Sequence, residues 1–406
     1  MNILVIGNGF DLAHDLPTKY TDFLCFIKVI MEIFDKFSSE NSEIDWGEIN
    51  SQIRKQIWKD MGNVRDNLYS KEAMWKDLIW NNFWIDYFQQ NSMYQKENWI
   101  DFESEISKVI QSLDEDMGSS ISGCLKLEDK IQRISNGFLN KRYLGWFGKN
   151  TYKELRDILL DDLNKLIRAF EIYLCEYVEK IDIQNKLSDI ESLKIDYVLS
   201  FNYTNTFSRL YDSEGKIEFD FIHGKADINN TIESNNMVLG IDEYLENDRK
   251  NRDVEFVAFK KFYQRIYKET GCKYKSWIKS IRKEYISLNK NEETFTNLLK
   301  QAYNADDNSK FLWNYFALVS NNEKKKERHN LYIFGHSLDI TDKDILCDLI
   351  LNDNVYTTIF YHNKDVMGQQ IVNLVKVIGQ DELIKRTGGS AKTIEFKPQQ
   401  DIVDIK

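Results

Sequence analysis

Four strand-like runs of this chain, far apart in the sequence, each end in small or polar residues that could handle a phosphate, a ribose or a proton. They lie at residues 1–9, 195–204, 217–224 and 330–339. In an open parallel sheet, ligands bind just beyond the carboxyl ends of the strands, where the strand order reverses. The pattern therefore predicts that the four segments meet at one site.

The sequence between these runs predicts the fold class. Long helical, aromatic-rich stretches separate the first run from the second and the third from the fourth, and the last third of the chain alternates strand and helix. We predict an α/β protein with a Rossmann-like parallel sheet that is interrupted by large α-helical insertions. The discontinuous nucleotide-binding domain is expected at 1–24, 191–241 and 329–406, and the helical insertions at 25–190 and 242–328.

Periodicity gives the individual elements. Short β-branched or aromatic runs indicate strands, and apolar stripes at helical spacing indicate helices with a buried face. The predicted strands are 3–6, 197–201, 219–222, 331–334 and 355–361, and the clearest predicted helices are 20–37, 155–177, 342–351 and 367–378.

Composition excludes several classes of protein. Of the 406 residues 13% are aromatic, which is enough for a packed core, and the net charge of −11 argues against a protein that coats nucleic acid. Five scattered cysteines and five histidines show neither a disulfide framework nor metal-ligand spacing. The first residues form a strand rather than a signal peptide, and no apolar run is long enough to span a membrane. We expect a soluble cytoplasmic protein without a bound metal.

The first candidate site loop follows the first strand directly and reads Gly7, Asn8, Gly9, Phe10, Asp11. Glycine permits a tight turn and lets a phosphate approach the main chain, and the helix that follows offers unpaired N–H groups to an anion. The alternative is an ordinary strand-to-helix turn in which Asp11 is a helix cap.

The second and third strands end in residues suited to a ribose and to proton transfer. Asn202 and Thr204 close the second strand, where an amide could hold a ribose hydroxyl or position a water. They could equally cap the short helix that follows. His223 and Gly224 end the next strand, and a histidine there is placed as a general base because its ordinary pKa is about 6.5.

The fourth strand is followed by Gly335, His336, Ser337 and Asp339, which could meet a phosphate or ribose edge, although Asp339 could instead cap the next helix. The GxSxG pattern of serine hydrolases is absent here. Glu103, in the first helical insertion, could reach into the same cleft, but acids are common at helix starts for electrostatic reasons alone.

Residues 258–288 alternate basic and aromatic side chains. Such a pattern suits nucleic-acid or partner binding. The preferred interpretation is an amphipathic helix with a lysine-rich, solvated face.

The segments GNGFDLAHDLPTKYTDF, WIDFE, FNYTNTF, IHG and GHSLDITDKDIL, in this order, resemble the AbiH family of bacterial phage abortive-infection proteins. The resemblance extends from Gly7 to about Asp348. That family in turn resembles the sirtuin-like nucleotide-binding superfamily, whose antiphage members hydrolyse NAD⁺ with an essential Asn and His. Carried over by resemblance, those roles fall on Asn202 and His223. The chain departs from sirtuins in having no zinc module and in carrying Thr204 where they have Asp.

The resemblance implies an antiphage effector that cleaves NAD⁺, its substrate, into ADP-ribose and nicotinamide. In that interpretation the loop after the first strand holds phosphate and the loop after the fourth lines the adenosine side, while Asp11 or Glu103 supports the developing cation. A phage-derived trigger or a homo-oligomer is the expected partner. Two alternatives stay open: a nucleotide-sensing module without turnover, and a toxin that targets nucleic acid through the basic segment.

Overall fold

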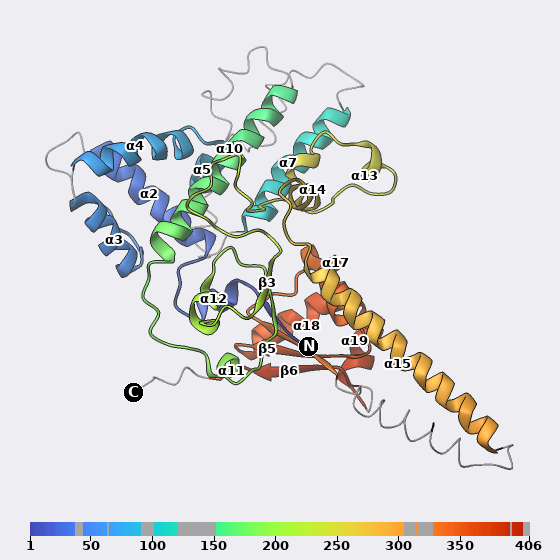
Figure 1. Cartoon of the computed structure of the whole chain (residues 1–406). Helices are drawn as coiled ribbons and strands as arrows, with labels where there is room; N and C mark the ends of the chain where they lie inside the picture. The colour runs from blue at the N-terminus through green and yellow to red at the C-terminus, as the bar shows by residue number, and fades with distance from the viewer. Residues whose placement is uncertain are drawn as a thin grey trace.

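The computed structural model describes residues 1–36, 44–62, 65–90, 101–119, 152–303, 314, 328–389 and 392–400. A parallel sheet of six strands in the order β3-β2-β1-β4-β5-β6 forms its centre (Figure 1). The strands are β1 (Asn2–Ile6), β2 (Tyr197–Ser200), β3 (Glu218–Phe221), β4 (His329–Phe334), β5 (Val355–Tyr361) and β6 (Ile394–Pro398). This is the strand order of a Rossmann-like fold, so the predicted fold class is confirmed.

The sheet is covered on both faces, as the apolar run in β1 predicts. Ile3 and Val5 point to one face and Leu4 and Ile6 to the other, and all four are buried. The first face packs against the start of α15 (Tyr274–Tyr303), α17 (Lys343–Ile350), α18 (Lys364–Ile378) and α19 (Gln380–Thr387). The second face packs against α1 (Asn8–Leu12), α11 (Ser188–Glu191) and α12 (Thr206–Tyr211).

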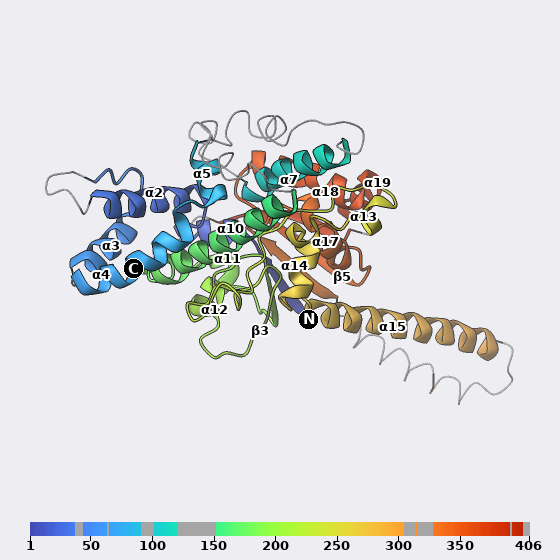
Figure 2. The same cartoon turned by 90° about the horizontal axis from the view of Figure 1, so that it is seen from above.

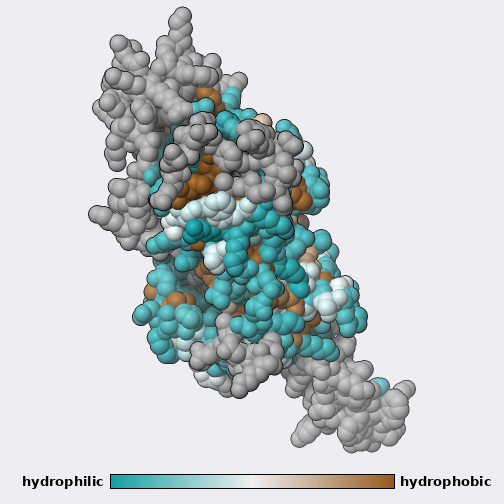
Figure 3. All heavy atoms as spheres, turned by 90° about the vertical axis from the view of Figure 1, so that its left-hand side faces the viewer, coloured by the Kyte–Doolittle hydropathy of each residue, from teal (hydrophilic) through white to brown (hydrophobic). Residues whose placement is uncertain are grey.

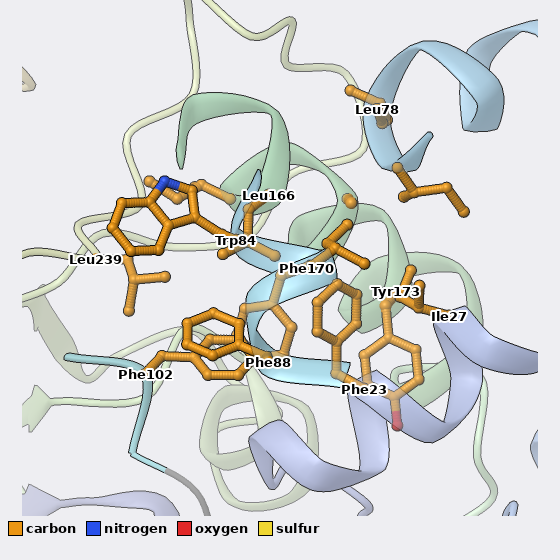
Figure 4. Packing of buried hydrophobic residues seen from close by; sticks show 14 of the residues in the cluster. Phe23, Ile27, Leu78, Trp84, Phe88, Phe102, Leu166, Phe170, Tyr173 and Leu239 are labelled. Carbon is orange, nitrogen blue, oxygen red and sulfur yellow. The ribbon is translucent and has the colours of Figure 1, made fainter. Parts of the chain in front are cut away.

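A separate helical layer lies beyond one end of the sheet (Figures 1 and 2). The predicted apolar stripes form its core, in which the Phe88 and Phe102 rings stack at 4.1 Å and Phe23 and Phe170 pack edge to face at 5.0 Å (Figure 4). Its helices are α2 (Tyr20–Lys36), α3 (Ser51–Gly62), α4 (Arg65–Ile79), α5 (Phe83–Gln90), α7 (Phe102–Ser119) and α10 (Tyr152–Tyr173), which continues as the π-helix Leu174–Val178.

The segment between β3 and β4 differs from the prediction. It begins with loops and the short helices α13 (Arg249–Arg252) and α14 (Lys261–Tyr267), and only then forms the long α15, which projects away from the body (Figures 1 and 2). The predicted solvated lysine face is wrong for Lys260 and Lys261, which are 2% and 5% exposed. The charged sequence NNEKKKER at 321–328 predicts a solvated connector, and all of it except Arg328 lies outside the described residues.

The C-terminal part of the fold extends beyond the prediction. The last predicted helix, 367–378, corresponds to α18, whereas α19 and β6, which pairs with β5, follow it and were not predicted. Over the described residues, no helix combines the length and the apolar character needed to cross a bilayer. On the side that carries α2 to α4, most of the described surface is hydrophilic, with hydrophobic residues in smaller groups (Figure 3).

Candidate functional site

The carboxyl ends of β1, β2, β3 and β4 open into a cavity of about 470 Å³. It lies where the strand order reverses between β1 and β4, which is the ligand position of open parallel sheets. Residues of α7, α10 and α14 complete its walls, so both insertions contribute. The predicted site residues that line it are Gly7, Asn8, Gly9, Asp11, Glu103, Asn202, Thr204, His223, Gly335, His336, Ser337 and Asp339.

Phe10 and Gly224 are the predicted site residues that do not line the cavity. The Phe10 ring is fully buried in the core, 6.0 Å from the ring of Phe334. Gly224 has a φ of +78°, and a Cβ there would lie 2.0 Å from the carbonyl oxygen of Asn236. Phe10 therefore anchors the first loop from behind, and Gly224 lets two backbone segments come close.

The glycines of the first and fourth loops hold these loops against each other. The N–H of Gly9 donates to the carbonyl of Gly335 at 2.8 Å, and that of Gly7 donates to Phe334 at 3.2 Å. Gly335 has a φ of +68°, and a Cβ there would lie 2.2 Å from the nitrogen of Phe10. Two amides of the first loop are used in this way, and the side chains of Asn8 and the nearby Lys19 line the cavity beside them.

Asp11 is a buried carboxylate at the start of the cavity. Its Oδ2 accepts a hydrogen bond of 2.6 Å from Oγ1 of Thr204. Its Oδ1 is buried and has no hydrogen-bond partner among the described residues. Burial raises the pKa of Asp11 to about 6, although the Thr204 hydroxyl opposes the shift. A carboxylate kept in such a place is available to a ligand.

The capping alternatives are wrong for Asp11, Asn202 and Thr204, whereas the one for Asp339 is confirmed. The N-cap of α1 is Gly7 and that of α12 is Asn205, and neither helix start is capped by a side chain. Asn202 instead donates from Nδ2 to the carbonyl of Gly7 at 3.0 Å, which joins the loops after β1 and β2. Asp339 does cap the turn after β4, since its Oδ1 accepts from the N–H of Thr341 at 3.1 Å.

Two histidines of the site share one carboxylate. Nε2 of His223 lies 3.7 Å from Oδ1 of Asp342, and Nε2 of His336 lies 3.5 Å from Oδ2. Burial lowers the pKa of His223, and Asp342 only partly opposes this shift. Burial alone would raise the pKa of Asp342, but the two histidines and the charge of Lys261 outweigh it and hold the pKa well below 3.8.

An ion pair joins the two insertions at the cavity. Nζ of Lys261, the first residue of α14, lies 2.6 Å from Oε2 of Glu103 in the first turn of α7. Burial raises the pKa of Glu103 to about 7 despite the attraction of Lys261. Burial would lower the pKa of Lys261, but Glu103, Asp342 and Asp242 outweigh it and raise the pKa. The cavity thus holds a fixed cation among several carboxylates.

Lys261 and Asp342 are the site residues that the sequence analysis missed. Lys261 was assigned to a solvated face; the apolar run 256–259 directly before it is the one signal of burial. Asp342 stands among other acids at a helix start, and nothing in the sequence distinguishes it from them. Among the described side chains, no three His, Cys, Asp or Glu residues are arranged as metal ligands.

The cavity brings together buried carboxylates, an amide beside the strand ends, and a histidine whose pKa is lowered by burial. The aromatic side chains of Tyr20, Phe170, Phe201 and Tyr203 supply flat apolar walls.

The family model described as "Bacteriophage abortive infection AbiH" matches residues 3–362. This match runs from β1 to the end of β5 and includes every loop that lines the cavity. Neither a curated protein nor a solved structure matches the chain.

Proposed function

Because the chain belongs to the AbiH family of bacteriophage abortive-infection proteins, we propose that it is an effector that hydrolyses NAD⁺ to ADP-ribose and nicotinamide. Family membership associates the chain with abortive infection, a defence against phage. The NAD⁺ chemistry rests on one observation. Asn202, His223 and Glu103, from distant parts of the sequence, line a single cavity at the switch point of a Rossmann-like sheet.

The size and position of the cavity suit a dinucleotide. Its volume of about 470 Å³ lies within the range of about 300–1,000 Å³ found for small-molecule sites. Lys19 and Asn8 lie beside the first loop, where Nζ of Lys19 could neutralise a diphosphate. The carboxylates that line the cavity attract the positively charged nicotinamide ring.

Hydrolysis needs a water, a proton acceptor and support for positive charge on the ribose. The water oxygen bonds to C1′ of the ribose while the C1′–N bond breaks. The electron pair of the broken C1′–N bond stays on the nitrogen and neutralises the departing nicotinamide ring. The carboxylates of Asp11 and Glu103 stabilise the oxocarbenium-like transition state. Asn202 orients the ribose or the water, and His223 takes the proton that the water loses.

The test is nicotinamide release from NAD⁺, measured by chromatography with purified protein and in phage-infected cells that express it. We expect release by the wild type, and a loss of roughly 10²–10⁴-fold in His223→Ala. Asn202→Ala should also abolish release while the fold is kept. His362→Ala is the matched control, because His362 is exposed and lies outside the cavity.

Intact NAD⁺ with the wild type, both at high protein concentration and in infected cells, would overturn the proposal. If calorimetry then detects NAD⁺ or ADP-ribose binding without product, the chain is a nucleotide sensor instead. The infected cells matter, because an effector that depletes its host of NAD⁺ must be held inactive until a phage product or assembly of several copies releases it.

A further inference from the structure

A backbone hydrogen bond fixes the tautomer of His336. The N–H of Leu338 donates to Nδ1 of His336 at 2.9 Å. A neutral imidazole has one N–H and one acceptor nitrogen, so the proton of His336 must be on Nε2. Leu338 adopts a φ of +60°, which is strained for a leucine. The strained turn thereby aims the Nε2–H of His336 at Oδ2 of Asp342.

Asp342 links the orientation of His336 to that of His223 through its two carboxylate oxygens. With Oδ2 facing His336, its Oδ1 faces Nε2 of His223 at 3.7 Å. The carboxylate is ionised, so it favours a proton on Nε2 of His223 and leaves the lone pair on Nδ1. That Nδ1 is buried and has no hydrogen-bond partner in the part of the chain that the structure describes. A buried acceptor without a partner is uncommon in folded proteins and needs an explanation.

We propose that His336, Asp342 and His223 form one proton-transfer unit in which Nδ1 of His223 accepts the proton and the other two are positioning residues. When a water or ribose hydroxyl in the cavity donates, its O–H bond breaks, an N–H bond forms on Nδ1, and the electron pair stays on oxygen. The imidazolium so formed keeps its Nε2–H towards the Asp342 carboxylate, which stabilises the new charge. The fixed tautomer of His336 prevents the carboxylate from turning away.

The surroundings set how strongly this unit holds its proton. Lys261 and Arg265 on α14 face His223 and oppose its protonation, while Asp342 favours it. The Phe201 ring packs between the two histidines, with its centroid 4.2 Å from that of His336 and 5.5 Å from that of His223. Contacts of 3.5 and 3.7 Å are long for hydrogen bonds, and such contacts commonly shorten when substrate binds.

The assignment can be tested without any turnover. The full chain labelled with ¹⁵N-histidine should show, at pH 8, the Nε2–H tautomer for both His223 and His336, with signals assigned by His223→Gln and His336→Gln. Asp342→Asn should lower the pKa of His223 further, because the carboxylate charge that favours its protonation is removed. In His336→Phe, His223 should become a mixture of the Nδ1–H and Nε2–H tautomers. His336→Gln keeps an acceptor for Leu338 and a donor for Asp342, so it should largely preserve the Nε2–H tautomer of His223.

Only the kinetic measurement with NAD⁺ rests on the proposed function. With NAD⁺ as substrate, Asp342→Asn should reduce kcat by roughly 10²–10⁴-fold with little change in KM. Two results would overturn the proposed unit even if NAD⁺ is cleaved: an Nδ1–H tautomer of His223 in the wild type, or a tautomer and pKa of His223 that do not change in Asp342→Asn. The expected tautomers in a protein that leaves NAD⁺ intact would support the unit and reject only the hydrolase.

Discussion

Replacing Asp11 by Asn should make the protein more stable at neutral pH and less active. The rise of the pKa of Asp11 from 3.8 to about 6 on folding corresponds to about 3 kcal/mol. Because the folded carboxyl holds its proton more tightly than the unfolded one, the stabilising contribution is full below about pH 4. It is lost as the pH rises through about 6, most of it between pH 4 and pH 7. Asn removes this loss because it does not ionise.

The assay is urea unfolding of wild type and Asp11→Asn between pH 4 and pH 8. The free energy of unfolding of the variant minus that of the wild type should increase by about 2.4 kcal/mol over this range. Other buried carboxyls, such as Asp242, titrate in both proteins and cancel in the difference. Asp381→Asn, at an exposed position of α19, is the control substitution.

A constant difference for Asp11→Asn would refute the reasoning that burial holds this carboxyl at a cost. The same variant should lose roughly 10²-fold or more of NAD⁺ cleavage, as expected when a group that stabilises the transition state is neutralised. Gain of stability together with loss of activity is the signature of a functional residue. A stabilised variant with full activity would remove Asp11 from the proposed mechanism.

Three further substitutions test other parts of the site. Gly335→Ala should prevent stable folding, because the added Cβ would collide with the Phe10 backbone. Gly368→Ala on α18 is the control: no atom lies near its Cβ, so thermal unfolding should show a gain in stability of about 1 kcal/mol. Lys261→Met should destabilise the protein because it leaves the buried Glu103 without an opposite charge. Adding Glu103→Gln should restore stability. Equal unfolding midpoints for the single and double variants would contradict the role of the ion pair. Lys19→Gln should raise KM for NAD⁺ several-fold with kcat kept, and an unchanged KM in steady-state kinetics would show that the diphosphate lies elsewhere.

The sheet and most of its site could be predicted because their signals are local. A short run such as 3–6, apolar on both faces, has few alternatives to a buried parallel strand. Once four such strands are parallel, their carboxyl ends must share an edge, so Asn202, His223 and His336 were brought together by topology alone. No contact between distant side chains had to be foreseen.

The residues that the sequence did not reveal depend on long-range packing. Lys261 is buried only because α14 lies over the cavity and Glu103, more than 150 positions earlier, supplies the opposite charge. Asp342 becomes special only because two histidines from separate strands approach it. Local composition reports average behaviour, in which lysines and helix-start acids are solvated, and it fails where a site departs from that average.

The free-energy cost of this cavity argues that it is used. Asp11 and Glu103 are held with raised pKa values, and one atom each of Asp11 and His223 is buried without a partner among the described residues. Apolar side chains would fill the same space at lower cost, and the large aromatic core in the neighbouring helices shows that this chain can build such packing. The polar groups also come from four strand ends and from both insertions, so the site is complete only when α7 and α14 are docked together. The effector proposed above, which depletes its host of NAD⁺, would gain from such dependence, because the site is incomplete without the Glu103–Lys261 contact.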